Sequence, residues 1–418
     1  CDHYRKCFIE RPVRRARTAD IVVANHALVM VQAAMGGGDE GVLPQRYVFD
    51  EGHHLFDAAD SAFSAHLSGR ETADLRRWLV GPEQARGAGR GRGLRDRAGD
   101  LIAGDNKGEE SIDDALAAAR ALPAARWGQR LAGGQPVGAA EAFLALVRQQ
   151  VYARDANPDG PYDMETDARP PIEGLLEAAG RLDTALARLE TPLTELTKAL
   201  LTRLDAEADE LDSATRARIQ GLARSIARRG AQPVAAWRSM LNSLNTAPPD
   251  AFVDWFGVSR IGGRDVDVGF SRHWLDPTQP LAETVYAPAH GVLVTSASLR
   301  DQSDPGAADG DGWPAADARA GAGHIAAATV RAAHASPFDY AGETRVLVVG
   351  DVNRGSAEEV SAAYRELFQA AGGGGLGLFT AIHRLRAVYD RIAGPLESGG
   401  IPLLAQHMDP IDTGTLID

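Results

Sequence analysis

The chain has 418 residues, 44% of them hydrophobic and 24% charged, a composition typical of a soluble globular protein with several cores. No apolar run approaches the ~18 residues of a transmembrane helix, so no membrane partner is expected. Only two cysteines exclude a disulfide-rich secreted scaffold and predict a reducing, cytoplasmic compartment. The net charge of −13 argues against a generally basic nucleic-acid coat.

The chain starts with Cys1, and no basic and apolar signal peptide precedes it. The last residues, Gly414–Asp418, carry no sign of a natural terminus. We therefore expect the numbering to begin and end inside a longer protein.

Basic side chains gather in two stretches near the start of the chain. The first consists of Arg11, Arg14, Arg15 and Arg17, and the second of Arg70, Arg76, Arg77, Arg86, Arg90, Arg92, Arg95 and Arg97. The second is diluted by acidic residues. Either stretch is a solvated helix face or flexible loop, or else a surface that follows phosphates.

The first predicted strands of a parallel sheet follow the first basic stretch. Ile21–Ala24 predicts a buried strand that ends at Asn25 and His26, and helix-forming residues follow. Tyr47–Phe49 predicts the next strand. Short, fully apolar strands with polar residues at their carboxyl ends are typical of a parallel α/β sheet, which binds ligands at those ends.

From about residue 60 to 260 the spacing of leucines predicts a long α-helical insertion. Gly87–Gly93 and Asn157–Pro161 are expected breaks within it. The stripe is interpreted as core rather than as a coiled-coil partner site; it comprises Leu175, Leu176, Leu182, Leu186, Leu189, Leu193, Leu196, Leu200, Leu201 and Leu204.

Strand character returns at Val266–Phe270 and at Gly291–Leu299, the latter followed by hydroxyl side chains. Residues 301–335 are rich in Ala, Gly and Asp and predict a loop or linker. A third α/β region follows, with strands at Arg345–Val349 and Gly377–Thr380 and a helix at Leu385–Leu396.

The most informative pattern is Asp50-Glu51 directly after an apolar strand. In hydrolytic phosphoryl transfer one carboxylate holds Mg²⁺ and its neighbour orients the attacking water. The alternative is an exposed acidic turn. A metal-hydrolase site with His53 and His54 is also conceivable, but the sequence has no His-Glu-x-x-His motif and no further ligand cluster.

No Gly-x-x-x-x-Gly-Lys-Ser/Thr loop occurs in the sequence. Without a phosphate cradle, Asp50 and Glu51 alone hydrolyse a nucleotide poorly. Either the chain is not a nucleotide hydrolase, or the cradle lies upstream of residue 1, as expected for an internal segment.

Several motifs then occur in a familiar order: Cys1–Cys7, Ala19–Leu28, Asp50–His53, Thr295–Leu299, Ser336–Asp339 and Leu378–Thr380. Together they resemble the XPD/DinG-like family of superfamily 2 iron–sulfur DNA helicases, the bacterial DinG type in particular. Asp50–His53 resembles the DEAH box, with Gly52 in place of Ala. Both residues are small, so this replacement should be tolerated. Ser298 replaces Thr and keeps the hydroxyl.

The resemblance implies an α/β fold of RecA-like parallel-sheet motor domains with a long α-helical, arch-like insertion. The implied order is the end of the iron–sulfur domain (1–17), part of the first motor domain (18–60), the insertion (61–265), a return to the first motor domain (266–300), a linker (301–343) and an incomplete second motor domain (344–418).

It also implies residue roles. Asp50 would hold Mg²⁺, Glu51 would activate water, and His53 with Thr295, Ser296 and Ser298 would couple hydrolysis to domain closure. Asn25, His26 and Thr380 would contact DNA, although Asn25-His26 is equally well read as a helix cap. Cys1 and Cys7 would be two of the four ligands of a [4Fe–4S] cluster.

The implied function is an ATP-dependent, Mg²⁺-dependent DNA helicase that moves 5′ to 3′ on single-stranded DNA and opens duplexes or DNA–RNA hybrids in DNA repair. It is expected to be a cytoplasmic monomer, inactive as this segment alone. The alternatives are a related helicase-like nuclease component and a nucleic-acid-binding protein without ATPase activity.

Overall fold

The computed structural model describes residues 7–8, 10–36, 43–82, 93–207, 209–300, 312–406 and 408. The chain divides into two units, Cys1–Val330 and Arg331–Asp418. Helices combine with one parallel and one antiparallel sheet, so the expected mixed α/β class is confirmed at that level. Within the described ranges, none of the helices is long and apolar enough to cross a bilayer.

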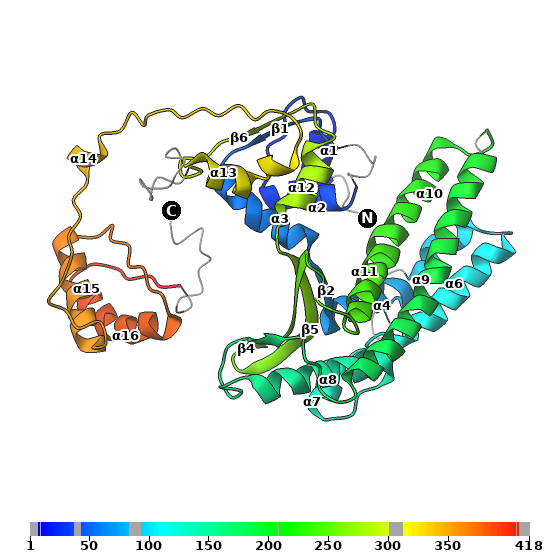
Figure 1. Ribbon diagram of the computed structural model, residues 1–418, viewed down its shortest axis with the longest axis horizontal. Coiled ribbons are helices and arrows are strands. Elements are labelled where there is room, and N and C mark those ends of the chain that lie inside the picture. The colour runs from blue at the N-terminus through cyan, green and yellow to red at the C-terminus, as the bar shows by residue number, and fades with distance from the viewer. Residues whose placement is uncertain are drawn as a thin grey trace. The chain divides into compact units, whose positions relative to one another are not determined.

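A small parallel sheet forms the first core of the larger unit (Figure 1). Strand β1 (Arg46–Phe49) pairs in parallel with β6 (Gly291–Val294), so both strands expected there are confirmed. Four helical segments pack around this pair: α2 (His26–Ala34), α3 (Leu55–Phe63), α12 (Thr278–Leu281) and the π-helical η6 (Ala282–Tyr286). Tyr47 and Phe49 point into this core, whereas Val48 between them is 72% exposed, as the alternation of a strand requires.

The strand expected at Ile21–Ala24 is wrong. These residues form no regular element, and Ile21 and Val23 are 84% and 95% exposed. A parallel strand needs a neighbour for its backbone hydrogen bonds. Among the described residues the parallel sheet has two strands, and this segment pairs with neither.

The insertion holds a sheet that the helical pattern did not predict. Strands β2 (Ala65–Ser68), β5 (Arg264–Trp274), β4 (Phe252–Ile261) and β3 (Met164–Asp167) form an antiparallel sheet in that order. The strand expected at 266–270 is therefore part of this sheet and not of the parallel one, and the chain rejoins the parallel sheet only at β6. The predicted boundary at residue 266 is wrong in that respect.

Helices make up the rest of the insertion. They are α4 (Gly69–Val80), α5 (Leu94–Ala98), η3 (Gly99–Leu101), α6 (Asn106–Ala118), η4 (Ala119–Ala121), α7 (Trp127–Ala132), α8 (Gly138–Arg154), α9 (Leu175–Ala206), α10 (Ser213–Ile226), the π-helical η5 (Ala227–Ala231) and α11 (Gln232–Ser243). The break expected at Asn157–Pro161 lies between α8 and β3, whereas most of Gly87–Gly93 lies outside the described residues.

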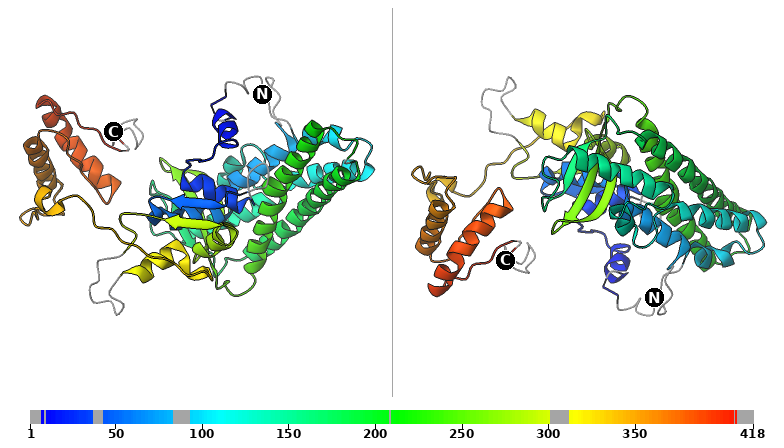
Figure 2. Two further views of the ribbon diagram at one scale, coloured as in Figure 1. Left: turned by 90° about the horizontal axis from the view of Figure 1, so that it is seen from above. Right: turned by 90° about the horizontal axis from the view of Figure 1, so that it is seen from below.

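The predicted leucine stripe is confirmed as core for most of its members. Helix α9 runs beside α6, α10 and α11 (Figure 2), and its leucines face them. The fully buried members are Leu175, Leu182, Leu186, Leu189, Leu193, Leu196 and Leu200. Leu176 and Leu201 are 37% and 45% exposed, because each follows a buried leucine by one position and turns away from the core.

The expected linker at 301–335 is wrong in part. Residues 301–311 lie outside the described residues, but α13 (Trp313–Ala320) and η7 (Ala322–His324) are helical. Gly312 and Gly321 flank α13 with φ of 68° and 75°, which glycine adopts without strain. His324 Nε2 lies 2.7 Å from Asp276 Oδ2, which fixes this helix to the segment before α12.

The second unit is built on two helices, α15 (Ala357–Ala371) and α16 (Ile382–Ser398), with the short α14 (Tyr340–Glu343) before them. The expected helix at 385–396 is confirmed. The strands expected at 345–349 and 377–380 are wrong: both segments are extended but unpaired, and Val348 is 90% exposed. The described residues of this unit contain no strand that could hydrogen-bond to them, so the RecA-like assignment stays a prediction.

One buried ion pair crosses the antiparallel sheet. Asp254 on β4 faces Arg272 on β5 in the register, and they form two hydrogen bonds of 2.7 and 2.8 Å. The two side chains are 3% and 8% exposed. Arg169 Nη1 also lies 3.4 Å from Asp254 Oδ2, so removing Arg272 would leave the buried Asp254 carboxylate with this longer contact alone.

We expect Arg272→Ala to lower the free energy of unfolding by about 3–5 kcal/mol, and Asp254→Leu with Arg272→Leu to recover most of it. Urea unfolding measures both. The exposed pair of Arg181 and Glu177 is the control, and Arg181→Ala should cost less than about 1 kcal/mol. A double variant as unstable as the single one would contradict the pairing argument.

Candidate functional site

The two turns that the sequence singled out lie side by side at the carboxyl ends of the parallel strands. Phe49 is in register with Val294, and beyond that pair Thr295 N–H donates to Phe49 O at 2.8 Å. Gly52 N–H then donates to Thr295 O at 2.9 Å. The backbone itself thus joins the acidic turn to the hydroxyl-rich turn.

His53 connects the side chains of these turns. Its Nδ1 is hydrogen-bonded to Ser296 Oγ at 2.8 Å and lies 3.2 Å from Glu51 Oε2. Ser296 Oγ also accepts from the N–H of Ser298 at 3.2 Å. Because a carboxylate only accepts hydrogen bonds, the position of Glu51 favours the His53 tautomer with the proton on Nδ1. His53 Nδ1 therefore lies between the Glu51 carboxylate of the first turn and Ser296 Oγ of the second.

Glu51 has an unusual backbone. Its φ of 49° and ψ of 48° lie in the left-handed region, which non-glycine residues rarely adopt. Its N–H is satisfied by Asp50 Oδ1 at 3.0 Å, and the chain enters the 3₁₀ segment η2 (Gly52–His54) directly afterwards. Such strain, of about 1–3 kcal/mol, is typical of functional sites. It points the Glu51 carboxylate toward solvent, where the side chain is 58% exposed.

The acids fit a Mg²⁺ ion that takes most of its ligands elsewhere. Among the described residues, no group of three His, Cys, Asp or Glu side chains is arranged to hold a metal. Mg²⁺ in nucleotide sites characteristically uses one or two carboxylates and completes its shell with water and phosphate oxygens. The exposed carboxylates of Asp50 and Glu51 meet that lesser requirement.

Gly52 is held against β6 more tightly than its replacement by Ala would allow. A Cβ at this position would lie 2.3 Å from Val294 Cγ1 and 3.4 Å from Thr295 O. Valine has a stiff χ1 and cannot easily turn away. Glycine is therefore accommodated at this position, as expected, whereas the reverse change to Ala would clash in this backbone.

The other predicted residues that the structure describes belong to other segments of the chain. Asn25 caps α2, since its Oδ1 accepts from Leu28 N–H at 2.9 Å, so the helix-cap interpretation is confirmed. The ring of His26 is 6.0 Å from that of Phe49. Thr380 is exposed before α16 in the second unit. Cys7 is half-buried, and Cys1 lies outside the described residues.

A polar network at the base of the insertion was not predicted. His273 Nδ1 lies 2.8 Å from both oxygens of Asp60, which joins β5 to α3. His66 on β2 is hydrogen-bonded to Ser64 Oγ at 3.0 Å and Ser271 Oγ at 3.2 Å. The two imidazole rings are 5.2 Å apart. The sequence contains no motif that predicts this network. Its members are single polar residues that the antiparallel pairing of β2 and β5 brings together.

Burial lowers the pKa of His66 below its ordinary value of 6.5. The charge of His273 lowers that pKa further, while Asp60 and Asp267 act in the opposite direction. The fold therefore favours the neutral imidazole.

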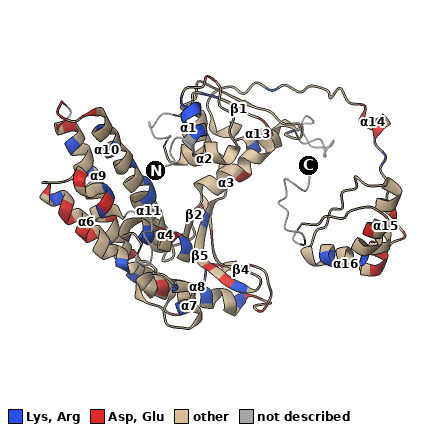
Figure 3. Ribbon diagram, turned by 180° about the vertical axis from the view of Figure 1, so that it is seen from behind, with Lys and Arg blue, Asp and Glu red and all other residues tan. Residues whose placement is uncertain are grey.

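The basic stretches follow helices. Arg11, Arg14 and Arg15 lie on α1 (Glu10–Ala16), whose ribbon is partly blue in Figure 3, whereas the ribbon of α9 carries both blue and red. In the second stretch Arg76 and Arg77 lie on α4, and Arg77 pairs with Asp74 one turn before it. Arg11, Arg15, Arg70 and Arg77 are exposed, whereas Arg76 and Arg97 are half-buried.

Comparison with known proteins places part of the chain among DNA helicases. Over 68 residues it is 50% identical to the ATP-dependent DNA helicase DinG of Escherichia coli (strain K12). These residues are 15% of this chain and 9% of that protein. Over 80 residues it is 38% identical to the ATP-dependent DNA helicase YoaA of the same strain, 18% of this chain and 12% of that protein. YoaA of Haemophilus influenzae is 33% identical over 78 residues.

The match thus spans about a tenth of each curated relative, and no family profile matches the chain. Within those segments, the resemblance to the DinG-like helicases that the motifs indicated is confirmed.

We expect Gly52→Ala to lower the free energy of unfolding by about 1–3 kcal/mol, because the added methyl group overlaps Val294 Cγ1. Adding Val294→Ala should restore part of that loss, which thermal unfolding would reveal. Gly180→Ala in α9 is the control: nothing lies within 4 Å of its Cβ position, and helix propensity predicts a small gain. Additive effects of the two substitutions would refute the steric argument.

His66 predicts a pH dependence of stability. Because its folded pKa lies below its unfolded one, its stabilising effect is present above pH 6.5 and is lost as the pH falls through the folded pKa. His66→Gln keeps hydrogen-bonding capacity without titrating. We expect the wild-type chain to lose more free energy of unfolding than this variant between about pH 7.5 and about pH 5. Parallel pH profiles of the two proteins would exclude His66 as the cause.

Proposed function

Since the chain shares these segments with the DinG-like DNA helicases, we propose that it is part of an ATP-dependent DNA helicase and supplies half of its ATP site. One observation carries the proposal: the acidic turn after β1 and the hydroxyl turn after β6 are hydrogen-bonded to each other at the carboxyl ends of parallel strands. Ligands of α/β sheets bind at that edge.

In the proposed mechanism Asp50 holds Mg²⁺, directly or through water, and Glu51 orients and deprotonates the attacking water. The metal, when bound, neutralises charge on the phosphates. The left-handed backbone of Glu51 separates the two neighbouring carboxylates, so that they serve different partners. The 58% exposure of the Glu51 side chain leaves it free to meet a water molecule.

His53 and Ser296 would then report the state of the nucleotide. When Glu51 engages the attacking water, its hold on His53 Nδ1 weakens, and the bond from that nitrogen to Ser296 Oγ remains. Ser296 Oγ also fixes the backbone at Ser298, so the second turn changes with the first. Thr295, Ser296 and Ser298 are in this way the proposed coupling residues.

The phosphate cradle and the rest of the motor would come from segments outside these 418 residues, since the sequence has no phosphate-binding loop. The same holds for an iron–sulfur cluster. Cys1 and Cys7 are the only cysteines, and two thiolates do not fit a four-ligand cluster by themselves.

DNA is the proposed polymer substrate, as single strands, duplexes or DNA–RNA hybrids, with 5′ to 3′ movement in DNA repair by a cytoplasmic monomer. His26 and Thr380 remain proposed DNA contacts. The oxygen of the Asn25 amide accepts the helix-cap bond, so its NH₂ group and its second lone pair remain for such a contact. The alternative is a nucleic-acid-binding protein or nuclease component without its own ATPase activity.

The test is Glu51→Gln in the protein that carries the complete motor. DNA-stimulated ATP hydrolysis should fall by roughly 10²–10⁴-fold, the usual contribution of a general base, while ATP binding is retained. Asp57→Asn is the matched control, because Asp57 is an exposed acid in the first turn of α3. Glu51→Gln turnover equal to that of the wild type would remove Glu51 from its role, and absent wild-type hydrolysis would favour the alternative.

A further inference from the structure

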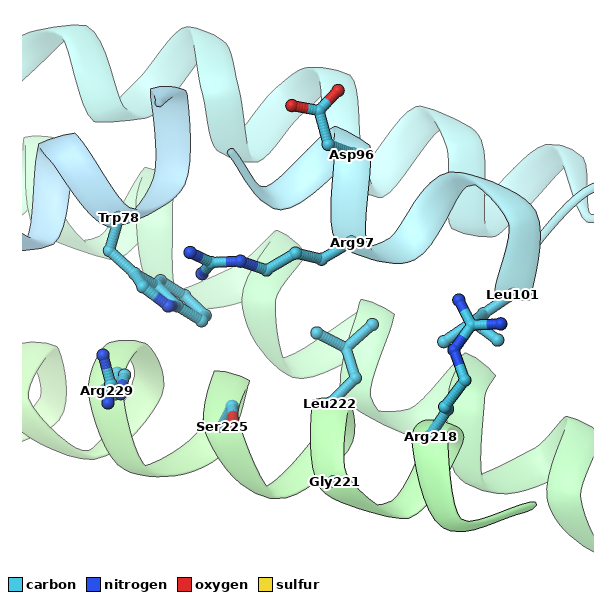
Figure 4. Close-up of a pocket in the computed structure, with 9 residues that line it drawn as sticks. All are labelled: Trp78, Asp96, Arg97, Leu101, Arg218, Gly221, Leu222, Ser225 and Arg229. Atoms are coloured by element: carbon cyan, nitrogen blue, oxygen red, sulfur yellow. The ribbon is translucent and has the colours of Figure 1, made fainter. Parts of the chain in front are cut away.

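A polar pocket lies on the insertion, in a different part of the unit from the strand ends. Helices α4, α5 and α10 and the π-helical η5 enclose a space of about 440 Å³. Figure 4 shows its wall, in which Trp78 and Leu222 supply apolar surface and Arg97, Arg218 and Arg229 supply charge. A pocket of this size accommodates a ligand as large as a nucleotide.

The backbone geometry that presents Arg229 is itself unusual. Arg229 lies in η5, a π-helical turn between α10 and α11. Next to it, Gly230 is buried, and a Cβ there would lie 2.9 Å from Leu193 Cδ1 on α9. The π-turn thus packs its glycine against the core while Arg229 stays exposed on the pocket side. Such single π-turns are frequent at functional sites.

Among the described residues, two of the guanidinium groups form no ion pair. Arg97 lies over the ring of Trp78, 5.2 Å from its centroid. Asp96 also belongs to the pocket lining, and in Figure 4 its carboxylate points away from the guanidinium of Arg97. Across the described residues, neither Arg97 nor Arg229 has a carboxylate within ion-pair distance, whereas Arg218 at the rim is paired with Asp100 at 2.6 Å.

The pKa of Arg97 is affected by these surroundings. Burial lowers its pKa, and the charge of Arg229 lowers that pKa further, while Asp96 only partly opposes them. Two neighbouring cations in a partly enclosed space repel each other, and an anion bound between them would remove that repulsion.

We propose that this pocket binds a nucleotide, with its phosphate between Arg97 and Arg229 and its base against the apolar wall of Trp78 and Leu222. Guanidinium groups match phosphate oxygens, and Ser225 adds a hydroxyl beside them. An indole edge and a leucine accept any base, so the pocket recognises the class and not the sequence. The nucleotide is either free or one unit of a single DNA strand, since both present the same groups.

Calorimetric titration of the 418-residue chain with AMP, with a thymidine oligonucleotide and with inorganic phosphate tests the proposal. We expect AMP or the oligonucleotide to bind, more weakly as salt increases, and Arg97→Gln and Arg229→Gln each to weaken binding by roughly tenfold or more. Tighter binding of the oligonucleotide than of AMP identifies a single strand as the source, and the reverse identifies a free nucleotide.

The control is Arg216→Gln, which removes the same charge from α10, a helix of the pocket wall, at a position outside the lining, and it should leave the affinity unchanged. Thermal unfolding provides a second measurement: without nucleotide, Arg97→Gln should unfold at a temperature equal to or above the wild type, because a repulsion is removed. Equal loss in all three variants, phosphate binding as tight as AMP binding, or no binding by the wild type would each overturn the proposal. Glu51→Gln should not alter this affinity, which separates this site from the proposed ATP site.

Discussion

Two backbone hydrogen bonds beyond the paired strands hold the candidate site together. Thr295 N–H to Phe49 O continues the ladder of β1 and β6, and Gly52 N–H to Thr295 O closes it over the acidic turn. Because these bonds fix both turns as rigid backbone, the single contact of His53 with Ser296 becomes a defined geometry and not one rotamer among several. The close approach that leaves no room for a Cβ at Gly52 is the steric consequence of the same pairing.

What the sequence predicted well depended on local pattern. The acids after Tyr47–Phe49, the helix around 385–396 and the leucine core of α9 are all read from neighbours in the chain. The contact of His53 with Ser296 spans 243 positions, and no local pattern contains it. The prediction that the two turns act together came from the order of the motifs along the chain.

The errors have physical reasons too. The hairpin of β4 and β5 turns at Gly262 and Gly263, both at positive φ, which is a recognisable Gly-Gly turn between β-branched and aromatic residues. The sequence does not predict this hairpin because residues 60–260 have a mainly helical composition. Conversely, Ile21–Ala24 and Arg345–Val349 have strand composition but no partner among the described residues. An apolar run predicts burial, yet a strand forms only where a second strand accepts its hydrogen bonds.

The insertion has a larger core than the parallel sheet, and this bears on how the site assembles. Its helices and antiparallel sheet form the larger of the two cores, whereas Arg46 must find Gly291 across the whole insertion. Once β2 and β5 pair, Ala65 lies opposite Arg272, so the chain ends that lead to α3 and α12 are already neighbours. The effective loop that β1 and β6 must close is then short. Asp60 on α3 and His273 on β5 are hydrogen-bonded across that junction. The position of the acidic turn therefore depends on the folding of the insertion.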